Sequence, residues 1–399
     1  MRSGDKLHGS RDERVASCWG EQTSFREDSE LMRSIAWAEH PLTERYINRK
    51  VTGDDEAYWV DWAAGKHLDS PVEVGLSLGS GSGYIERHII DGGYSTAMEG
   101  VDISAEAVRL AGEAACGRPV TYRKLDLNRD SLEEERYDFV VSAAALHHVT
   151  NLEHCLSEVH RSLNDGGLLI MHEFVGPDRF QWTDRQLDLV NRVYAVIPDR
   201  YRHNSITGEA HDSIERKPIG HMIEADPSEA VRSSEVLGVV SRFFETVELK
   251  EIGGALLHPL LEGIIGNFDE GDPCDAALLK MIIALDDAHT ARDYLSSDFV
   301  VLVGRKRKAV TSVEKTSRTG REKLDTISRQ EEEILELNRR LKEAQRLVTE
   351  LGEAGKEQAL EFEALRRDIE ALSAENEALK SRGPLRTLRF LRAKLRRHR

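Results

Sequence analysis

Three glycines at alternate positions follow a short apolar run that ends at Leu78, and this feature restricts the fold more than any other. The glycines are Gly79, Gly81 and Gly83. A strand that turns sharply into a helix, here expected at 84–91, leaves its backbone open to a ligand. The next expected strand ends in Asp102, where an acid can bind ribose hydroxyls. The segment therefore predicts a nucleoside-binding βαβ unit.

Strands and helices alternate from residue 72 onward, which predicts an α/β fold with a doubly wound, mostly parallel sheet. The expected strands are 72–79, 96–102, 119–126, 137–143, 167–175, 244–252 and 298–304. The expected helices are 84–91, 104–116, 152–163, 181–196, one that starts within 225–230, 256–267 and 275–291. The domain is expected to span 67–306. Its stretch 176–243 breaks the alternation and is expected to cover the ligand site.

The N-terminal 66 residues have a different character. Residues 1–30 are polar and charged without a clear period, so we expect them to be poorly ordered. Residues 31–66 are expected to form a helical extension rich in tryptophan and tyrosine. Two interpretations remain open for it: a cap packed on the domain edge, or a lid whose aromatic side chains line a pocket.

The C-terminal third is expected to be a coiled coil. A basic linker at 307–322 precedes a segment, 323–382, in which apolar residues recur with 3,4 spacing. The seam includes Ile334, Leu337, Leu341, Ala344, Val348, Leu365, Ile369, Leu372, Asn376 and Leu379. It predicts a homo-oligomer, with a parallel dimer favoured and a trimer open. The alternative is one amphipathic helix folded back on the domain.

The last residues, 383–399, form a basic amphipathic tail without an acidic residue. Such a helix suits an anionic membrane surface. A solvated tail, or one that docks on an acidic partner, is the alternative.

Charge and cysteine usage exclude several classes of protein. The net charge of −16 argues against nucleic-acid binding. The four cysteines include no C-x-x-C pair, so neither a metal site nor a disulfide scaffold is expected, and a reducing cytoplasm fits. No signal peptide and no run of ~20 apolar residues is present.

The identity of residue 84 distinguishes between cofactors. A dinucleotide fingerprint would have glycine there, and this chain has Tyr84. The loop resembles motif I of class I S-adenosylmethionine-dependent methyltransferases, and segments 100–104, 125–127, 142–149 and 164–170 match later motifs in order. The resemblance implies a seven-stranded Rossmann-like sheet and S-adenosyl-L-methionine as cofactor. The residues it assigns to cofactor binding are Ser77, Gly79, Ser80, Gly81, Gly83, Asp102, Ile103, Asp126, Leu127 and Ala143.

One position departs from the family pattern. The family usually has an acid two residues before the first glycine, where this chain has Ser77. Serine keeps a hydrogen bond but loses the charge, which is expected to lower cofactor affinity without abolishing binding, since Asp102 and Asp126 remain.

Histidines supply the candidates for general base, because methylation of a hydroxyl requires removal of its proton. His147 and His148 follow the fourth expected strand, and His172 lies near the end of the fifth. Strand alternation places His172 and Glu173 on opposite faces. Each histidine has a structural alternative, and His147 in particular could support the cofactor instead.

A further resemblance concerns the acceptor. Segments 173–182 and 226–233 resemble methyltransferases of bacterial surface-polysaccharide clusters, and the coil and tail resemble those of O-antigen chain-terminating enzymes. This implies an O-methyltransferase of a polysaccharide or its lipid-linked precursor, cytoplasmic and peripheral at the membrane, with a glycosyltransferase or polymerase partner. The alternatives are a methyltransferase of a soluble small molecule and a non-catalytic scaffold.

Overall fold

A seven-stranded sheet forms the centre of the computed structural model, with strand order β3-β2-β1-β4-β5-β7-β6. The structure describes residues 10–26, 29–69, 71–292, 294–308, 313–354 and 366–375. The strands are β1 (Val72–Leu78), β2 (Ser95–Asp102), β3 (Val120–Lys124), β4 (Tyr137–Ala143), β5 (Leu163–Phe174), β6 (Phe244–Gly253) and β7 (Phe299–Lys306). The first five strands pair in parallel, whereas β7 runs antiparallel to both β5 and β6. The predicted mostly parallel, Rossmann-like sheet is confirmed.

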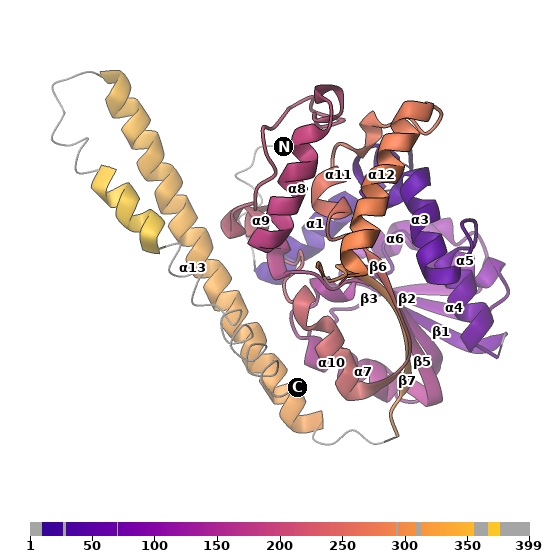
Figure 1. Cartoon of the computed structure of the whole chain (residues 1–399). Helices are drawn as coiled ribbons and strands as arrows, with labels where there is room; N and C mark the ends of the chain where they lie inside the picture. The colour runs from indigo at the N-terminus through magenta and orange to yellow at the C-terminus, as the bar shows by residue number, and fades with distance from the viewer. Residues whose placement is uncertain are drawn as a thin grey trace, which may run out of the picture.

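Helices cover both faces of this sheet (Figure 1). They are α1 (Arg11–Arg26), α2 (Ser29–Ile35), α3 (Pro41–Thr52), α4 (Trp59–His67), α5 (Tyr84–Asp91), α6 (Ala105–Ala114), α7 (Leu152–Ser162), α8 (Asp184–Val196), α9 (Ile219–Ala225), α10 (Val236–Phe243), α11 (Leu257–Leu261), α12 (Pro273–Thr290) and α13 (Val313–Ala354). One buried apolar cluster joins the sheet to α3, α4, α8, α11 and α12, and a second joins it to α7 and α10. The central strands are buried on both sides, which explains their nearly continuous apolar sequence.

Side-chain caps fix where several of these helices begin. Ser104 accepts a hydrogen bond from the backbone of α6, Asn151 from that of α7, and Thr183 forms a capping box with Gln186 at the start of α8. These caps satisfy N–H groups that lack a partner within the helix. Because α6 follows β2 and α7 follows β4 along the chain, the caps also fix where the loops at the carboxyl edge of the sheet end.

The expectation of a poorly ordered N-terminus is wrong for its described part, since α1 and α2 are helices. Val15 and Thr23 of α1 are buried, and so is the Arg11 side chain. Arg11 donates hydrogen bonds to Glu331 of α13, to Thr150 and to the carbonyl of Pro227. Tertiary contacts therefore hold a helix whose sequence has little periodicity of its own.

The helix expected to start within 225–230 is also absent; this segment is a turn. Asp226 Oδ1 accepts hydrogen bonds from the backbone N–H of Ser228 and from its hydroxyl, at 2.7 and 2.6 Å. An aspartate that closes a local turn in this way competes with helix formation. The next α-helix, α10, starts only at Val236.

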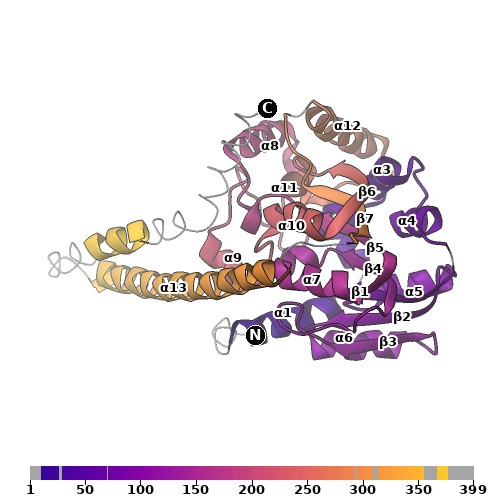
Figure 2. The same ribbon diagram turned by 90° about the horizontal axis from the view of Figure 1, so that it is seen from below.

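The expected coiled coil is not confirmed. Helix α13 begins at Val313, inside the expected linker, and it packs on α7 and α9 (Figures 1 and 2). The seam residues Ile334 and Leu337 are buried against the chain's own domain, as are Leu324 and Ile327. The alternative of a helix folded back on the domain therefore holds for the part of α13 that carries these residues.

The remaining seam is described only in part. A second helical segment, 366–375, lies alongside the far half of α13 in both views (Figures 1 and 2). Asn376 and the basic tail 383–399 fall outside the described residues. Among the helices that are described, none has both the length and the apolar composition needed to cross a bilayer.

Candidate active site

The glycine loop after β1 has a backbone that only glycine adopts readily. Gly79, Gly81 and Gly83 have φ values of 63°, 52° and 80°, in the left-handed region. A Cβ on Gly83 would also lie 2.3 Å from the hydroxyl of Tyr122, whereas no atom lies within 4 Å of the Cβ position at Gly81. The loop is therefore tightly packed behind Gly83 and open at Gly81, where a ligand can approach the backbone.

Two acids stand at the ends of neighbouring strands beside this loop. Asp102 ends β2, is buried, and accepts hydrogen bonds from the N–H groups of Gly81 and Ser104 at 3.0 and 2.8 Å. Burial raises the pKa of Asp102, while these hydrogen bonds act in the opposite direction. Asp126 follows β3 and accepts hydrogen bonds from Asn128. Each carboxylate has further lone pairs for a ligand.

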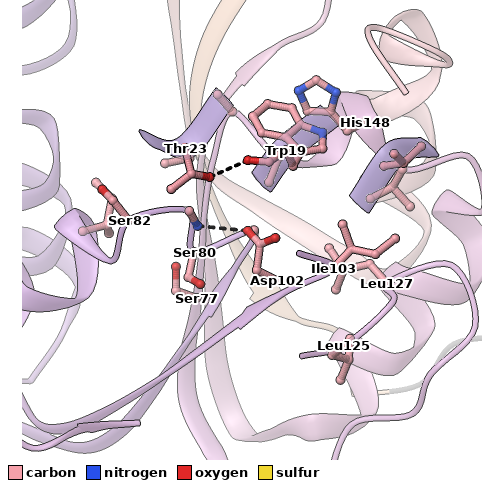
Figure 3. A pocket seen from close by; sticks show the side chains of 18 of the residues that line it. Trp19, Thr23, Ser77, Ser80, Ser82, Asp102, Ile103, Leu125, Leu127 and His148 are labelled. Carbon is pink, nitrogen blue, oxygen red and sulfur yellow. Dashed lines mark hydrogen bonds between the residues drawn. The ribbon is translucent and has the colours of Figure 1, made fainter. Parts of the chain in front are cut away.

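A cavity of about 230 Å³ opens between these groups (Figure 3). Nine of the ten residues predicted to bind cofactor line it: Ser77, Gly79, Ser80, Gly81, Asp102, Ile103, Asp126, Leu127 and Ala143. Gly83 does not line the cavity; it is the residue from which α5 starts. The buried hydroxyl of Ser80 has no hydrogen-bond partner among the described residues, as expected for a group that bonds a ligand.

Helix α1 closes one side of this cavity. Val15, Trp19 and Thr23 line it (Figure 3), and Gly20 of the same helix approaches Ser104 closely. The sequence interpretation missed these residues because α1 carries no motif. The aromatic lid that was considered for residues 31–66 is thus supplied in part by Trp19, one helix earlier.

Behind the loop, Glu86 is fully enclosed. Neither of its carboxyl oxygens has a hydrogen-bond partner among the described residues. Burial raises the pKa of Glu86 to about 7, with neighbouring Ser77 acting in the opposite direction. An acid therefore lies next to Ser77, although it is contributed by α5 and not by β1.

His148 is the one predicted base that lines the cavity. Its Nδ1 lies 3.2 Å from Ser228 Oγ, and Ser228 donates its own proton to Asp226. Ser228 therefore accepts from Nδ1–H, which leaves the lone pair of His148 on Nε2. Trp19 Nε1 donates to the same hydroxyl at 3.2 Å.

His147 is buried between two carboxylates. Its Nδ1 is hydrogen-bonded to Glu173, and its Nε2 lies 3.5 Å from Glu229 Oε1. Burial alone would lower the pKa of His147, but the two carboxylates raise it to about 10. Burial alone would raise the pKa of Glu229, but His148 and His147 lower it to about 2. This group is a charged cluster beside the cavity.

His172 is placed elsewhere. It faces Trp59 of α4, with ring centroids 5.5 Å apart, and it does not line the cavity. Burial lowers its pKa to about 4. Glu173 points to the other face of β5 and holds His147, as strand alternation predicts. The structure therefore separates His172 from the other two histidines.

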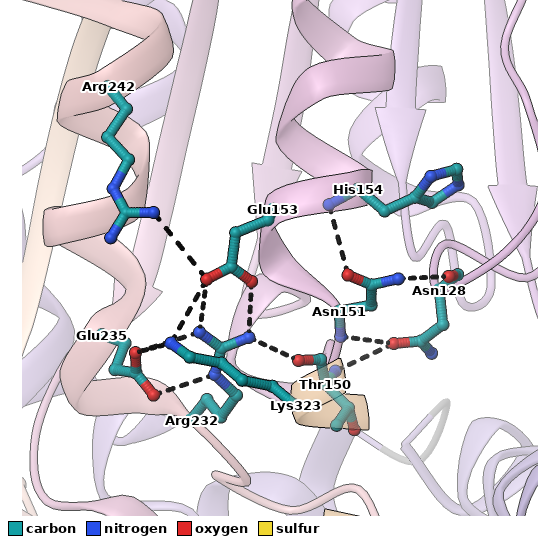
Figure 4. A network of polar contacts seen from close by, with 9 residues as sticks. All are labelled: Asn128, Thr150, Asn151, Glu153, His154, Arg232, Glu235, Arg242 and Lys323. Atoms are coloured by element: carbon teal, nitrogen blue, oxygen red, sulfur yellow. Dashed lines mark hydrogen bonds and ion pairs between the residues drawn. The ribbon is translucent and has the colours of Figure 1, made fainter. Parts of the chain in front are cut away.

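Arginines of the stretch 176–243 are engaged in ion pairs. Arg232 is buried and forms ion pairs with Glu153 and Glu235, to which Lys323 of α13 adds a further charge (Figure 4). Burial alone would raise the pKa of Glu153, but Arg232 and Lys323 lower it to about 2. Arg200 pairs with Asp275. Neither arginine lines the cavity.

The central segment of the chain matches a known protein family. Residues 76–171 match the model of a family described as methyltransferase domain. These residues span β1 to β5 and contain the glycine loop, Asp102, Asp126 and His148. The predicted methyltransferase domain and its cofactor, S-adenosylmethionine, are thereby confirmed. The buried orphan hydroxyl of Ser80 and the open backbone at Gly81 fit such a ligand.

Similar proteins cover only part of the chain. An uncharacterised methyltransferase of Mycobacterium tuberculosis is 32% identical over 125 residues, 29% of this chain and 62% of the relative. A hybrid PKS-NRPS synthetase of Xenoacremonium sinensis is 32% identical over 146 residues, 28% of this chain and 4% of the relative. The chain thus spans less than two thirds of the length of these curated relatives.

Solved structures of low identity were also found. An S-adenosylmethionine-dependent methyltransferase from Mesorhizobium loti is 17% identical with a TM-score of 0.37, covering 63% of this chain and 99% of that one. Phosphoethanolamine N-methyltransferase 2 from Haemonchus contortus is 13% identical with a TM-score of 0.40, covering 70% and 60%.

Proposed function

We propose that the protein is an S-adenosylmethionine-dependent O-methyltransferase. The observation that carries this proposal is the cavity itself, in which the open glycine loop, Asp102 and His148 line one space. When bound, the cofactor supplies a methyl group on a positively charged sulfur, and transfer to an oxygen breaks the carbon–sulfur bond. The protein has to bind the cofactor and the acceptor, align them with each other and exclude water.

Different residues of the chain carry out these tasks. The loop at Gly81 and the carboxylate of Asp102 bind the nucleoside side of the ligand, while α1 with Trp19 excludes water from it. The hydroxyl proton of the acceptor is lost at the group formed by His147, His148 and Glu229, because this is the titratable cluster that reaches the cavity through His148.

Charge around this cluster favours a neutral acceptor. Glu173, Glu229 and Asp226 surround the two histidines. The neighbouring guanidinium groups are already engaged in ion pairs: Arg232 with Glu153, and Arg179 with Glu331, which it shares with Arg11. The protonated His147 offsets only one of these three carboxylates, so an anionic acceptor such as a phosphate would be repelled by the remainder. A hydroxyl on a neutral molecule is the better fit.

For the acceptor itself, the proposal is a sugar hydroxyl of a bacterial surface polysaccharide or its lipid-linked precursor, whose methylation would end chain growth. The sequence resemblance of segments 173–182 and 226–233 supports it. The same proposal includes a cytoplasmic location at the membrane, with membrane contact through 385–399. It also includes a glycosyltransferase partner and oligomerisation through the part of the C-terminal seam that follows Leu337.

A soluble small-molecule acceptor is the second candidate. It is favoured by similarity to segments of polyketide-type synthetases, although each of those segments is a small fraction of its protein.

Transfer of a labelled methyl group tests both candidates. The full chain is incubated with methyl-labelled S-adenosylmethionine and either lipid-linked oligosaccharide and polysaccharide fractions or a panel of small phenols and polyketides. Label in the carbohydrate supports the first candidate, and label in a small molecule supports the second. Cofactor binding without any transfer would favour the non-catalytic scaffold.

A further inference from the structure

We propose that His147, His148 and Glu229 together bind one divalent transition-metal ion beside the cofactor cavity. This inference rests on the proposed function, because it assigns to the ion a role in methyl transfer. It differs from the sequence expectation of no metal, which considered cysteine spacing alone. The two histidines are adjacent in sequence, but Glu229 comes from the 225–230 turn, so no sequence spacing reveals the set.

The three side chains converge from two parts of the chain. One ligand-type atom of each lies within 4.8 Å of the others. The rings of His147 and His148 have centroids 4.0 Å apart, and His147 Nε2 lies 3.5 Å from Glu229 Oε1. Donor atoms on one tetrahedral ion are about 3.3 Å apart, given bonds of about 2.0 Å. The separation of His147 Nε2 and Glu229 Oε1 is already close to that spacing, and the limit of 4.8 Å for the whole set exceeds it by about 1.5 Å.

Neighbouring groups orient both imidazoles for ligation. His147 donates Nδ1–H to the fully buried Glu173, whose other oxygen accepts from the backbone of Ala145 and Leu146 at 3.1 and 2.7 Å. His148 donates Nδ1–H to Ser228. At His147 the hydrogen bond at Nδ1 leaves Nε2 facing Glu229, as carboxylates do behind metal-bound histidines, and at His148 it leaves the lone pair on Nε2.

The donor set indicates the class of ion. Two imidazoles and one carboxylate suit zinc, iron, cobalt or nickel better than magnesium, which prefers oxygen ligands. Three protein ligands leave coordination positions open. The ion would take the place of the proton that His147 otherwise holds between two carboxylates.

Because His148 lines the cofactor cavity, an ion bound to it would lie at the cavity wall, which would give the ion a chemical role. A hydroxyl bound to a divalent ion loses its proton more readily than a free one. The acceptor oxygen would then be deprotonated while it bonds the ion, and its lone pair would form the new bond to the methyl carbon as the bond to sulfur breaks. The released proton passes to solvent.

Calorimetry with Zn²⁺ on the full chain, freed of metal by a chelator, tests the site. We expect one tight site in the wild type, weakened more than about 10-fold in E229Q and in H148N. C116S/C274S is the matched control, because these exposed cysteines could bind zinc on their own; it should retain the tight site. Two variants are used so that a folding defect in one, checked by circular dichroism, leaves the other informative.

The outcomes separate this inference from the proposed function. Wild type without a tight site, or E229Q and H148N with wild-type affinity for Zn²⁺, overturns the metal site. Titration of the same samples with S-adenosylmethionine is read independently. Glu229 does not line the cofactor cavity, so E229Q should bind the cofactor as wild type does. A wild type that binds Zn²⁺ but not S-adenosylmethionine would contradict the proposed function alone.

Discussion

The indole of Trp19 lies edge-on against the imidazole of His148, with ring centroids 4.5 Å apart and an interplanar angle of 78°. Both rings line the cavity, so a helix without any recognisable motif contacts the one predicted base that reaches the cofactor site. Trp19 also donates to the hydroxyl of Ser228 that orients this imidazole. Helix α1 is therefore part of the active site.

Replacing Trp19 by alanine should weaken cofactor binding. The substitution opens one wall of the cavity to water and removes a hydrogen bond from Ser228, and we expect about a 10-fold rise in the Kd for S-adenosylmethionine, or about 1.4 kcal/mol. Calorimetry measures it. Trp62→Ala is the control, since Trp62 on α4 does not line the cavity and its loss should leave Kd unchanged. Equal effects of both substitutions would contradict a role for α1 as a lid.

Asp102→Asn tests the acid at the end of β2. The amide keeps the size of the side chain but loses the negative charge that strengthens hydrogen bonds from the ribose hydroxyls. Its NH2 group would also face the N–H of Gly81 or of Ser104, where a carboxylate oxygen now accepts. We expect Kd for the cofactor to rise about 10- to 100-fold, since hydrogen bonds to a charged group contribute about 1.5–3 kcal/mol. The exposed Asp188→Asn on α8 should bind as wild type does. Unchanged affinity in Asp102→Asn would place the nucleoside elsewhere.

Helix α13 is coupled to the active site through Glu331. This buried carboxylate pairs with Arg11 of α1 and with Arg179, and both guanidinium groups also reach the carbonyl of Pro227. Glu331→Ala leaves two buried cations without their partner, which should cost about 3–5 kcal/mol of unfolding free energy. It should also weaken cofactor binding, because α1 loses its anchor.

The control for this coupling lies on the same helix. Glu336 is exposed and pairs only with Arg339 among the contacts described for it, so Glu336→Ala should change neither property. Thermal unfolding and cofactor titration of both variants provide the comparison. Wild-type stability in Glu331→Ala would mean that α13 does not dock on the domain in solution.

The buried Glu86 makes stability depend on pH. Its pKa is about 7 in the folded protein against 4.5 for an ordinary glutamate, so below pH 4.5 its burial carries no ionisation penalty. As pH rises toward 7, the unfolded chain releases this proton while the folded protein keeps it, and stability falls. Above pH 7 the loss reaches about 3 kcal/mol at most.

Glu86→Gln isolates this effect, because the amide does not titrate. The free energy of unfolding of the variant should rise relative to that of wild type as the pH is raised from 5 to 8. Denaturant unfolding at these two pH values measures the difference. A difference in unfolding free energy between wild type and Glu86→Gln that does not change with pH would show that Glu86 is not buried as an acid.

The sequence predicted the sheet and most of the cofactor-binding residues because both follow from local patterns. Apolar runs identified the seven strands, and positive φ at Gly79 and Gly81 is a requirement that only glycine meets without cost. Helix α1 could not be predicted, because its order comes from distant partners such as Glu331. A helix was expected to start within 225–230, and the side chain of Asp226 closes a turn there instead.

The heptad seam shows a different limit of sequence patterns. A stripe of apolar residues with 3,4 spacing predicts a buried helix face but does not say what covers it. Ile334 and Leu337 are covered by the chain's own domain. The same residue pattern would serve a second copy of the chain equally well.

Calorimetric titration of the full chain with S-adenosylmethionine shows whether the cavity binds this cofactor. We expect one site per chain, with a Kd between about 1 µM and 1 mM, the range of KM values for enzymes, and with binding weakened in Asp102→Asn but not in Asp188→Asn. Absence of binding at millimolar ligand, or binding that is insensitive to Asp102→Asn, would contradict this expectation.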